Sequence, residues 1–286
     1  MKDYANEFKG KKALITGGSR GIGAAAAQRF IDGGATVVVC ARSLHEQTPS
    51  EAAFIKGDIS TLAGANAVAE EALKILGGLD ILVNNVGAAA AKRPGIEAIS
   101  DDDWIESLMI NFMSAVRITN PLLKALRESS SGAIINISAG GLTPFHGFLA
   151  HYGAAKAALN SYTRSLAKEL APVGVRVNLV TPGAIITPGA DEGRKLLTTA
   201  LGITTEQLFS AIPLEGRAGT AEEMAEMIAF LASDRASYIT GHNHFVSGGF
   251  GELVLCHVIC FKTIPSLIKK ESEANVDNKT FKVFKK

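Results

Sequence analysis

Tyr152 and Lys156 stand four residues apart in the segment YGAAK, a spacing that can support proton-transfer chemistry. In a helix, positions i and i+4 share one face, so the phenol and the ammonium group can lie side by side. A phenol has a pKa of about 10, and a neighbouring cation lowers that pKa by favouring the phenolate. The pair predicts a general acid and base. Taken alone, the spacing also fits an ordinary helix-surface pair.

Ser138 adds a hydroxyl to this pair. It directly follows the apolar run AIINI at 133–137, which is typical of a buried strand. Ligands of open parallel sheets bind outside the carboxyl ends of the strands. An isolated serine would serve as a cap or turn. Together with Tyr152 and Lys156, it is expected to hydrogen-bond a substrate oxygen.

The segment TGGSRGIG at 16–23 predicts a phosphate-binding turn, because it follows a strand and opens a helix. Glycines at 17, 21 and 23 let backbone N–H groups approach a pyrophosphate, whose charge the helix N-terminus favours. A tight turn without a ligand is the alternative.

The end of the second predicted strand indicates which dinucleotide would bind. Dinucleotide folds that take NAD usually place a carboxylate there, for the ribose 2′-OH. Here Ala41 holds that position and Arg42 follows, while Arg20 lies in the glycine turn. A guanidinium pairs well with a phosphate, so the two arginines favour NADP over NAD. Each arginine alone would more often be a solvated surface charge.

These groups need a scaffold, and short apolar runs alternate with helical stretches along the chain. The fold class expected is α/β, a single-domain doubly wound parallel sheet of the Rossmann type. Strands are predicted at 13–16, 36–40, 53–56, 80–84, 133–137, 175–180 and 243–246, and helices at 21–32, 62–76, 103–128, 151–171 and 221–232.

The composition, 47% hydrophobic and 20% charged, is that of a globular protein. A net charge of +1 favours neither nucleic acid nor an anionic membrane. We expect no signal peptide and no membrane span, and therefore a cytoplasmic protein. One domain is expected over 1–253, including a substrate lid at about 188–215, and a loosely ordered tail over 254–286.

With these motifs in order, the chain resembles the short-chain dehydrogenase/reductase superfamily over roughly residues 8–250. The motifs are TGGSRGIG, GDIS with Asp58, NNVG at 84–87, Asn111 in INF, NISAG with Ser138, YGAAK and PGAIIT at 182–187. The resemblance implies an oxidoreductase that moves a hydride between NADP(H) and a carbonyl or secondary alcohol. It also implies a homo-oligomer, a dimer or a tetramer.

The resemblance also implies residue roles. Tyr152 would be the acid and base, Lys156 would lower its pKa and hold the ribose, Ser138 would orient the carbonyl, and Asn111 would hold a relay water. Asn84 would either stabilise the sheet or lie near the ribose. The implied cofactor-binding set is Gly17, Ser19, Arg20, Gly21, Ile22, Gly23, Arg42, Asp58, Ile59, Asn84, Gly87, Tyr152, Lys156, Pro182, Gly183, Ile185 and Thr187.

The chain departs from the family pattern between Arg42 and Asp58, where a helix is shortened or lost. We expect this to loosen the wall around a 2′-phosphate. No metal site is expected: His242 and His244 lack a third ligand, and Asp101, Asp102 and Asp103 fit the start of a helix.

The expected substrate is a small to mid-sized, largely apolar ketone or its alcohol. The predicted pocket walls are mostly apolar, formed by Gly140, Leu142, Phe145, His146 and Phe148 and by lid residues Leu197, Leu201 and Phe209. A 3-oxoacyl-thioester reductase is the alternative enzyme, although no basic patch for a carrier protein is evident. A non-catalytic NADP-binding sensor is the alternative of another class.

Overall fold

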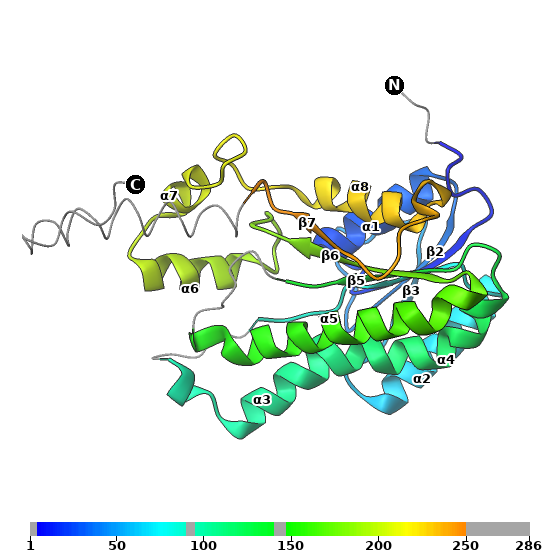
Figure 1. Ribbon diagram of the computed structural model, residues 1–286, viewed down its shortest axis with the longest axis horizontal. Coiled ribbons are helices and arrows are strands. Elements are labelled where there is room, and N and C mark those ends of the chain that lie inside the picture. The colour runs from blue at the N-terminus through cyan, green and yellow to red at the C-terminus, as the bar shows by residue number, and fades with distance from the viewer. Residues whose placement is uncertain (1–4, 90–94, 140–146, 250–286) are drawn as a thin grey trace, which may run out of the picture.

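Parallel strands form the centre of the molecule. In this computed structural model, which describes residues 5–89, 95–139 and 147–249, seven strands pair in the order β3-β2-β1-β4-β5-β6-β7 (Figure 1). The order reverses between β1 and β4, and ligands of such sheets bind at this point. The strands are β1 Lys12–Thr16, β2 Thr36–Ala41, β3 Ala53–Lys56, β4 Ile81–Asn84, β5 Ala133–Ile137, β6 Arg176–Pro182 and β7 Asn243–Val246.

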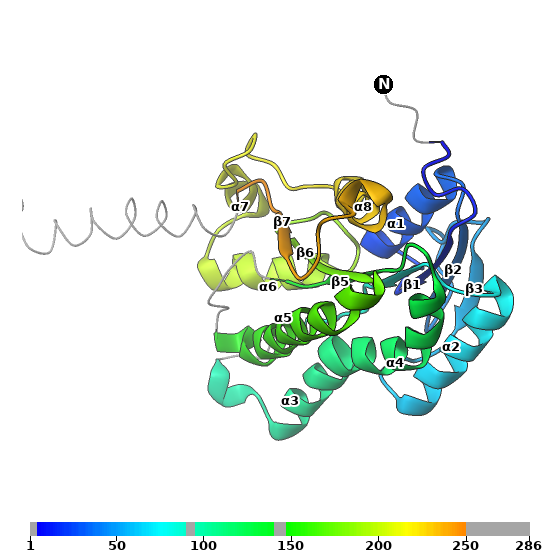
Figure 2. The same cartoon turned by 45° about the vertical axis from the view of Figure 1, so that its right-hand side comes forward.

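Helices cover both faces of this sheet. On one face lie α1 (Gly21–Asp32) and α8 (Ala221–Ala232), and on the other lie α2 (Leu62–Leu76), α4 (Ser114–Glu128) and α5 (Ala150–Leu170) (Figures 1 and 2). α3 (Asp101–Leu108) leads into α4. The doubly wound α/β fold predicted from the sequence is confirmed.

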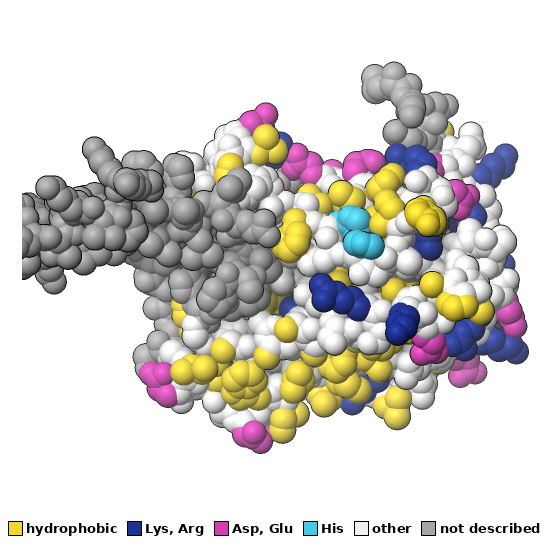
Figure 3. Space-filling view, in the orientation of Figure 1, with side chains coloured by type: hydrophobic (Ala, Val, Ile, Leu, Met, Phe, Trp, Pro, Cys, Tyr) yellow, Lys and Arg dark blue, Asp and Glu magenta, His cyan; other side chains and the backbone are white. Residues whose placement is uncertain are grey.

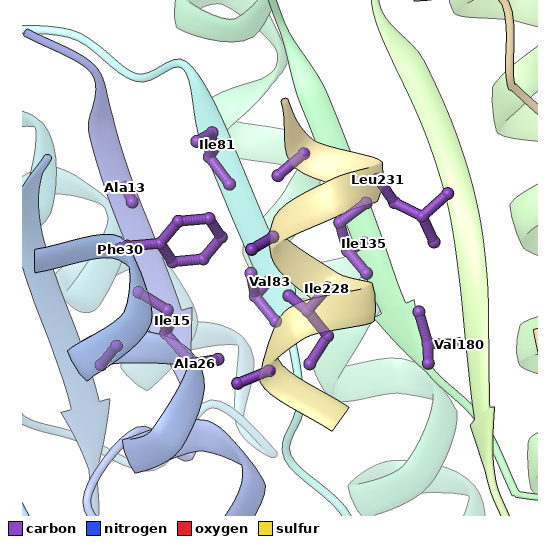
Figure 4. Packing of buried hydrophobic residues seen from close by; sticks show 14 of the residues in the cluster. Ala13, Ile15, Ala26, Phe30, Ile81, Val83, Ile135, Val180, Ile228 and Leu231 are labelled. Atoms are coloured by element: carbon purple, nitrogen blue, oxygen red, sulfur yellow. The ribbon is translucent and has the colours of Figure 1, made fainter. Parts of the chain in front are cut away.

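The alternation of side chains along each strand builds two hydrophobic layers. Leu14 faces α2, α4 and α5, whereas its neighbour Ile15 faces α1 and α8. In Figure 4, Ile228 and Leu231 of α8 lie over strand residues of the layer that contains Ile15. Strands buried on both faces explain why they read as continuous apolar runs in the sequence.

The predicted helix over 103–128 is wrong in one respect. The chain forms α3, then a π-helical turn at Met109–Met113, and only then α4. A π turn widens the helix by one residue and is frequent at functional sites. Asn111, a candidate catalytic residue, lies in this turn.

The predicted lid contains two helices, α6 (Asp191–Leu201) and α7 (Thr205–Ser210). A backbone bridge closes its base: Ile186 N donates to Gly219 O (2.9 Å), and Gly219 N donates to Ala184 O (2.9 Å). The boundary at residue 253 stays a prediction, because residues 250–286 lie outside the described ranges. Within those ranges, no helix has the length and apolar character that crossing a membrane requires.

Candidate active site

The glycine turn between β1 and α1 has the backbone that only glycine adopts without strain. Gly17 and Gly21 have positive φ angles of 65° and 56°. At Gly23 a Cβ would lie 2.3 Å from Gly17 O, so a side chain there would force α1 away from the turn. The turn is therefore built for close backbone packing, as its sequence predicts.

Asn85 holds this turn, a role that the sequence argument missed. Its Nδ2 donates to Thr16 O (3.1 Å) and Gly17 O (3.1 Å), and its backbone N donates to Thr16 Oγ1 (3.0 Å). The motif NNVG holds this second asparagine directly after Asn84, at the end of β4.

The segment between β2 and β3 lies against the same turn. Residues 42–52, all described, contain no helix, as predicted. The expected loosening of the wall around a 2′-phosphate stays a prediction, but side chains tie the segment to the glycine turn. Gly21 N donates to Gln47 Oε1 (3.0 Å), and Thr48 Oγ1 donates to Ser19 O (3.1 Å). Hydrogen bonds therefore replace the missing helix.

A cleft of about 600 Å³ runs from this region to the Tyr152–Lys156 pair. At the end beside the glycine turn, the cleft is lined by Arg20, Arg42 and Asp58. The pKa of Asp58 is lowered by hydrogen bonds from the Ser60 hydroxyl and backbone, and further by the nearby charge of Arg42. This end of the cleft thus combines exposed cations with a carboxylate that stays ionised.

The residues of the sequence-predicted site separate into two groups. The cleft does not include Gly23, Asn84 and Asn111. It is lined by Gly17, Ser19, Arg20, Gly21, Ile22, Arg42, Asp58, Ile59, Gly87, Ser138, Tyr152, Lys156, Pro182, Gly183, Ile185 and Thr187.

Lys156 is buried where α5 meets the end of β5. Its side chain is 3% exposed, and Nζ donates to Ile137 O (2.9 Å) and lies 6.0 Å from the centroid of the Tyr152 ring. Burial lowers the pKa of Lys156 to about 8. The helical face expected from the YGAAK spacing is therefore formed.

The electrostatics of Tyr152 differ from the expectation. Burial raises the pKa of Tyr152, whereas the spacing argument predicted a lowering by the ammonium group. The reason is desolvation, which disfavours the phenolate and, at Lys156, the ammonium group.

Asn111 is buried and fixed by the loop that follows β4. Its Oδ1 accepts from Ala88 N (2.9 Å), and its Nδ2 donates to Ala88 O (2.9 Å) and Ser107 O (3.0 Å). At Gly87 a Cβ would lie 3.2 Å from both Asn111 Oδ1 and Lys156 Nζ. The two side chains therefore converge on this glycine.

Asn84 belongs to a hydrogen-bond network inside the sheet and not to the cleft surface. Its Nδ2 donates to Asn136 Oδ1 (2.8 Å) and Thr119 Oγ1 (3.1 Å), and Asn136 Nδ2 donates to Thr163 Oγ1 (2.8 Å). Of the two roles left open for Asn84, these contacts support sheet stabilisation.

The comparisons with known proteins agree with this geometry. Residues 17–251 match the family model described as Enoyl-(Acyl carrier protein) reductase. The chain is 36% identical over 248 residues to the 3-oxoacyl-(acyl-carrier-protein) reductase FabG of Escherichia coli, covering 85% of this chain and 98% of that protein. This chain belongs to the short-chain dehydrogenase/reductase family. It is therefore an oxidoreductase, of a family that uses NAD(P) and acts on small molecules.

Other members of the family are similar over most of their length. General stress protein 39 of Bacillus subtilis is 35% identical over 262 residues, 87% of each chain. Among solved structures, the aldohexose dehydrogenase AldT of Thermoplasma acidophilum has a TM-score of 0.76 at 28% identity, covering 86% of this chain and 95% of its own. The Cj0485 dehydrogenase has a TM-score of 0.78 at 29% identity, covering 87% and 97%.

The structure describes some of the remaining candidates of the sequence and leaves others outside the described residues. Asp103 forms a capping box with Ser100 at the start of α3. Within residues 5–89, 95–139 and 147–249, no group of three or more potential metal ligands exists. Phe148 is buried. Gly140, Leu142, Phe145 and His146 lie outside the described residues.

A dinucleotide fits the cleft of this family member. The glycines of the turn carry no side chains, the N–H of Gly21 is held by Gln47 Oε1 (3.0 Å), and a Cβ at Gly87 would lie 3.2 Å from Lys156 Nζ. The cleft is continuous from Arg42 to Tyr152. A glycine turn at a helix N-terminus, with cations at the same end of the cleft, suits the NAD(P) that this family uses.

Proposed function

We propose that this protein is an NADP-dependent oxidoreductase that interconverts a ketone and its secondary alcohol, with Tyr152 as the general acid and base. The observation that carries the proposal is the single cleft that joins the glycine turn and Arg42 to Ser138, Tyr152 and Lys156. A binding protein without catalysis would have no need for a phenol beside a buried ammonium group at one end of it.

The cofactor would be held along the whole cleft. The pyrophosphate would lie at the N-terminus of α1, near Gly21 and Ile22, and the nicotinamide near Ile185 and Thr187. When bound, it supplies or accepts the hydride. Arg42, with Arg20, would pair with a 2′-phosphate, which is why NADP is favoured over NAD.

The chain's own residues would manage the proton. In the reducing direction, the Tyr152 hydroxyl would donate its proton to the substrate oxygen, and Ser138 would hydrogen-bond the same oxygen. The ammonium group of Lys156 would stabilise the phenolate that remains. Lys156 and Ser138 are buried, and a low dielectric around them would strengthen these interactions.

Substrate size and polarity follow from the lid side of the cleft. It is lined by small and apolar residues, among them Ala190, Gly193 and Leu208. The charged side chain there, Arg194, is already engaged: it contacts Asp191 Oδ1 (2.7 Å) and Ile185 O (3.1 Å). These observations support an uncharged, largely apolar ketone.

A cofactor titration coupled to a substrate panel tests the proposal. NADPH and NADH are titrated by fluorescence, and each is then assayed with small ketones, larger apolar ketones and 3-oxoacyl thioesters. We expect tighter NADPH binding and turnover of the apolar ketones. Absence of turnover with every carbonyl, despite tight NADPH binding, would leave a sensor function instead.

A 3-oxoacyl-thioester reductase is the second candidate, favoured by the 36% identity to FabG of Escherichia coli. Carrier proteins are acidic, so recognition calls for a basic patch. On the face drawn in Figure 3, Lys and Arg side chains are scattered among acidic and hydrophobic ones. Turnover confined to acyl thioesters in the panel would establish this candidate and overturn the first.

We also propose that the protein forms a homo-oligomer. β7 is an edge strand of the sheet, and its Phe245 is 52% exposed. Exposed apolar side chains on an edge strand favour a protein contact. Light scattering on the purified protein tests this, and a monomer at assay concentration would contradict it.

A further inference from the structure

Ser138 has a partner that the family resemblance did not assign. Its Oγ donates to Oδ1 of Asn160 at 2.5 Å, and Ser138 is 2% exposed. Asn160 lies on α5 one turn beyond Lys156 and two turns beyond Tyr152. Residues spaced by four along a helix share one face, so the face that presents the phenol and the ammonium group also presents this carboxamide.

The observed hydrogen bond conflicts with the chemistry proposed for Ser138. A hydroxyl has one proton to donate. In the geometry described here that proton points to Asn160 Oδ1, yet a serine that polarises a substrate carbonyl must donate the same proton to the substrate oxygen. Ser138 must therefore turn its proton away from Asn160 Oδ1 when it polarises a carbonyl, which leaves Asn160 able to act as a donor instead.

A carboxamide can make this change without leaving its place. Its two ends have nearly the same shape, and one accepts while the other donates. Rotation of the Asn160 side-chain amide by about half a turn, which a terminal sp³–sp² torsion allows, would present Nδ2–H to Ser138 Oγ. Ser138 would then accept from Asn160 and donate to the substrate.

We propose that Asn160 is a positioning residue that switches Ser138 between a resting and a substrate-polarising state. This rests on the proposed function, since it requires a carbonyl oxygen in front of Ser138. In the active state, two hydrogen bonds run in one direction, from Asn160 Nδ2–H to Ser138 Oγ and from Ser138 O–H to the carbonyl. Such chains polarise one another, so each bond is stronger than it would be alone.

An N160D variant separates this role from a structural one. An ionised carboxylate accepts hydrogen bonds but donates none, so it would keep the Ser138 proton. We expect kcat for ketone reduction to fall by about a hundredfold at alkaline pH, with KM changed far less. As pH falls and the aspartate is protonated, its O–H can donate to Ser138 Oγ. The ratio of N160D to wild-type kcat should then rise.

Two further variants show whether the pH dependence of N160D comes from its contact with Ser138. N160L has the same branched arrangement of side-chain heavy atoms and forms no hydrogen bonds, so its kcat should fall by about tenfold, and its ratio to wild-type kcat should be the same at every pH. S161D introduces a carboxylate at the neighbouring exposed position, away from Ser138, and should follow the wild-type pH profile. Thermal unfolding and NADPH binding by fluorescence report whether each variant is folded.

A double-mutant cycle completes the test. If Asn160 acts through Ser138, N160D should have no further pH-dependent effect in an S138A background. A pH-independent ratio for N160D, or an equal loss in both backgrounds, would overturn the switch while leaving the proposed reductase intact. Failure of wild-type protein to reduce any carbonyl would instead overturn the proposed function, and the switch with it.

Discussion

Lys156 Nζ donates a 2.9 Å hydrogen bond to the backbone carbonyl of Ile137, the residue immediately before Ser138. This bond joins α5 to the end of β5, so the helix that carries Tyr152 and the strand end that carries Ser138 are fixed relative to each other. The ammonium group thus has a structural role in addition to its electrostatic one. The effects of changing Lys156 should accordingly appear both in turnover and in stability.

Removal of the phenol hydroxyl should stop turnover and spare cofactor binding. Tyr152→Phe keeps the ring near Lys156 but has no proton to transfer, so kcat should fall by a factor of about 100 to 10,000. The NADPH dissociation constant, measured by fluorescence, should stay within about threefold of the wild-type value. Turnover at the wild-type rate would exclude Tyr152 as the acid.

The buried Lys156 should make stability depend on pH in a defined direction. Its pKa is about 8 in the folded protein and 10.5 when unperturbed, so between these values the unfolded chain binds more protons. The unfolding free energy should therefore rise with pH across this window, because deprotonation removes the cost of a buried charge. Below pH 8 the full cost, about 3 kcal/mol by linkage, is present.

Urea unfolding of Lys156→Met at several pH values checks this. The variant should gain most over wild type near neutral pH, and its advantage should shrink as pH rises from about 8 to about 10.5. The lost bond to Ile137 O subtracts a constant amount at every pH. Lys168→Met, on the exposed side of the same helix, serves as the control. A constant difference between Lys156→Met and wild type would contradict the lowered pKa.

Arg42 should determine the preference between the two dinucleotides. Arg42→Ala removes the charged donor that we propose for the 2′-phosphate, so NADPH should bind about tenfold or more weakly, while NADH binding changes little. Weaker salt dependence of NADPH binding should accompany the loss. Arg127→Ala, where the arginine pairs with Glu169 outside the cleft, is a matched control. An equal loss for NADPH and NADH would assign Arg42 no part in recognising the phosphate.

The glycine turn should tolerate no side chain at Gly23. Gly23→Ala would place a Cβ 2.3 Å from Gly17 O and 2.6 Å from Asn85 Nδ2, so α1 or the turn must move. We expect a destabilisation of about 2 kcal/mol or more, together with weaker cofactor binding. At Gly193, inside α6, a Cβ meets nothing within 4 Å. Gly193→Ala should be neutral or stabilise by up to about 1 kcal/mol.

Much of the fold could be predicted because its signals are local. The bounds of α1, α2, α8, β3, β5 and β7 agree with those expected from apolar runs and glycine positions. The π-helical turn around Asn111 could not be predicted, because its sequence MINFM is compatible with a regular helix. Tertiary contacts, such as the bonds of Asn111 to Ala88, are what make this turn specific.

In the candidate site too, features set by local sequence could be predicted and features set by tertiary packing could not. The pairing of Tyr152 with Lys156 follows from helix geometry alone and was predicted. The contact between Ser138 and Asn160 depends on how far α5 is rotated against β5, which the packing of two distant segments decides. The high pKa of Tyr152 was also missed, because a spacing reveals a neighbour but not the depth of burial.

The backbone bridge at Gly219 holds the two ends of the lid next to each other, so the lid begins and ends at the same place. Because entry and exit are adjacent, the chain between Ile186 and Gly219 can lengthen, shorten or change its helices without altering the strand register behind it. Ser138, Tyr152 and Lys156, which we propose to handle the proton, all precede the lid. Changes in the lid beyond Thr187 can therefore alter the substrate range of the enzyme without moving Ser138, Tyr152 or Lys156.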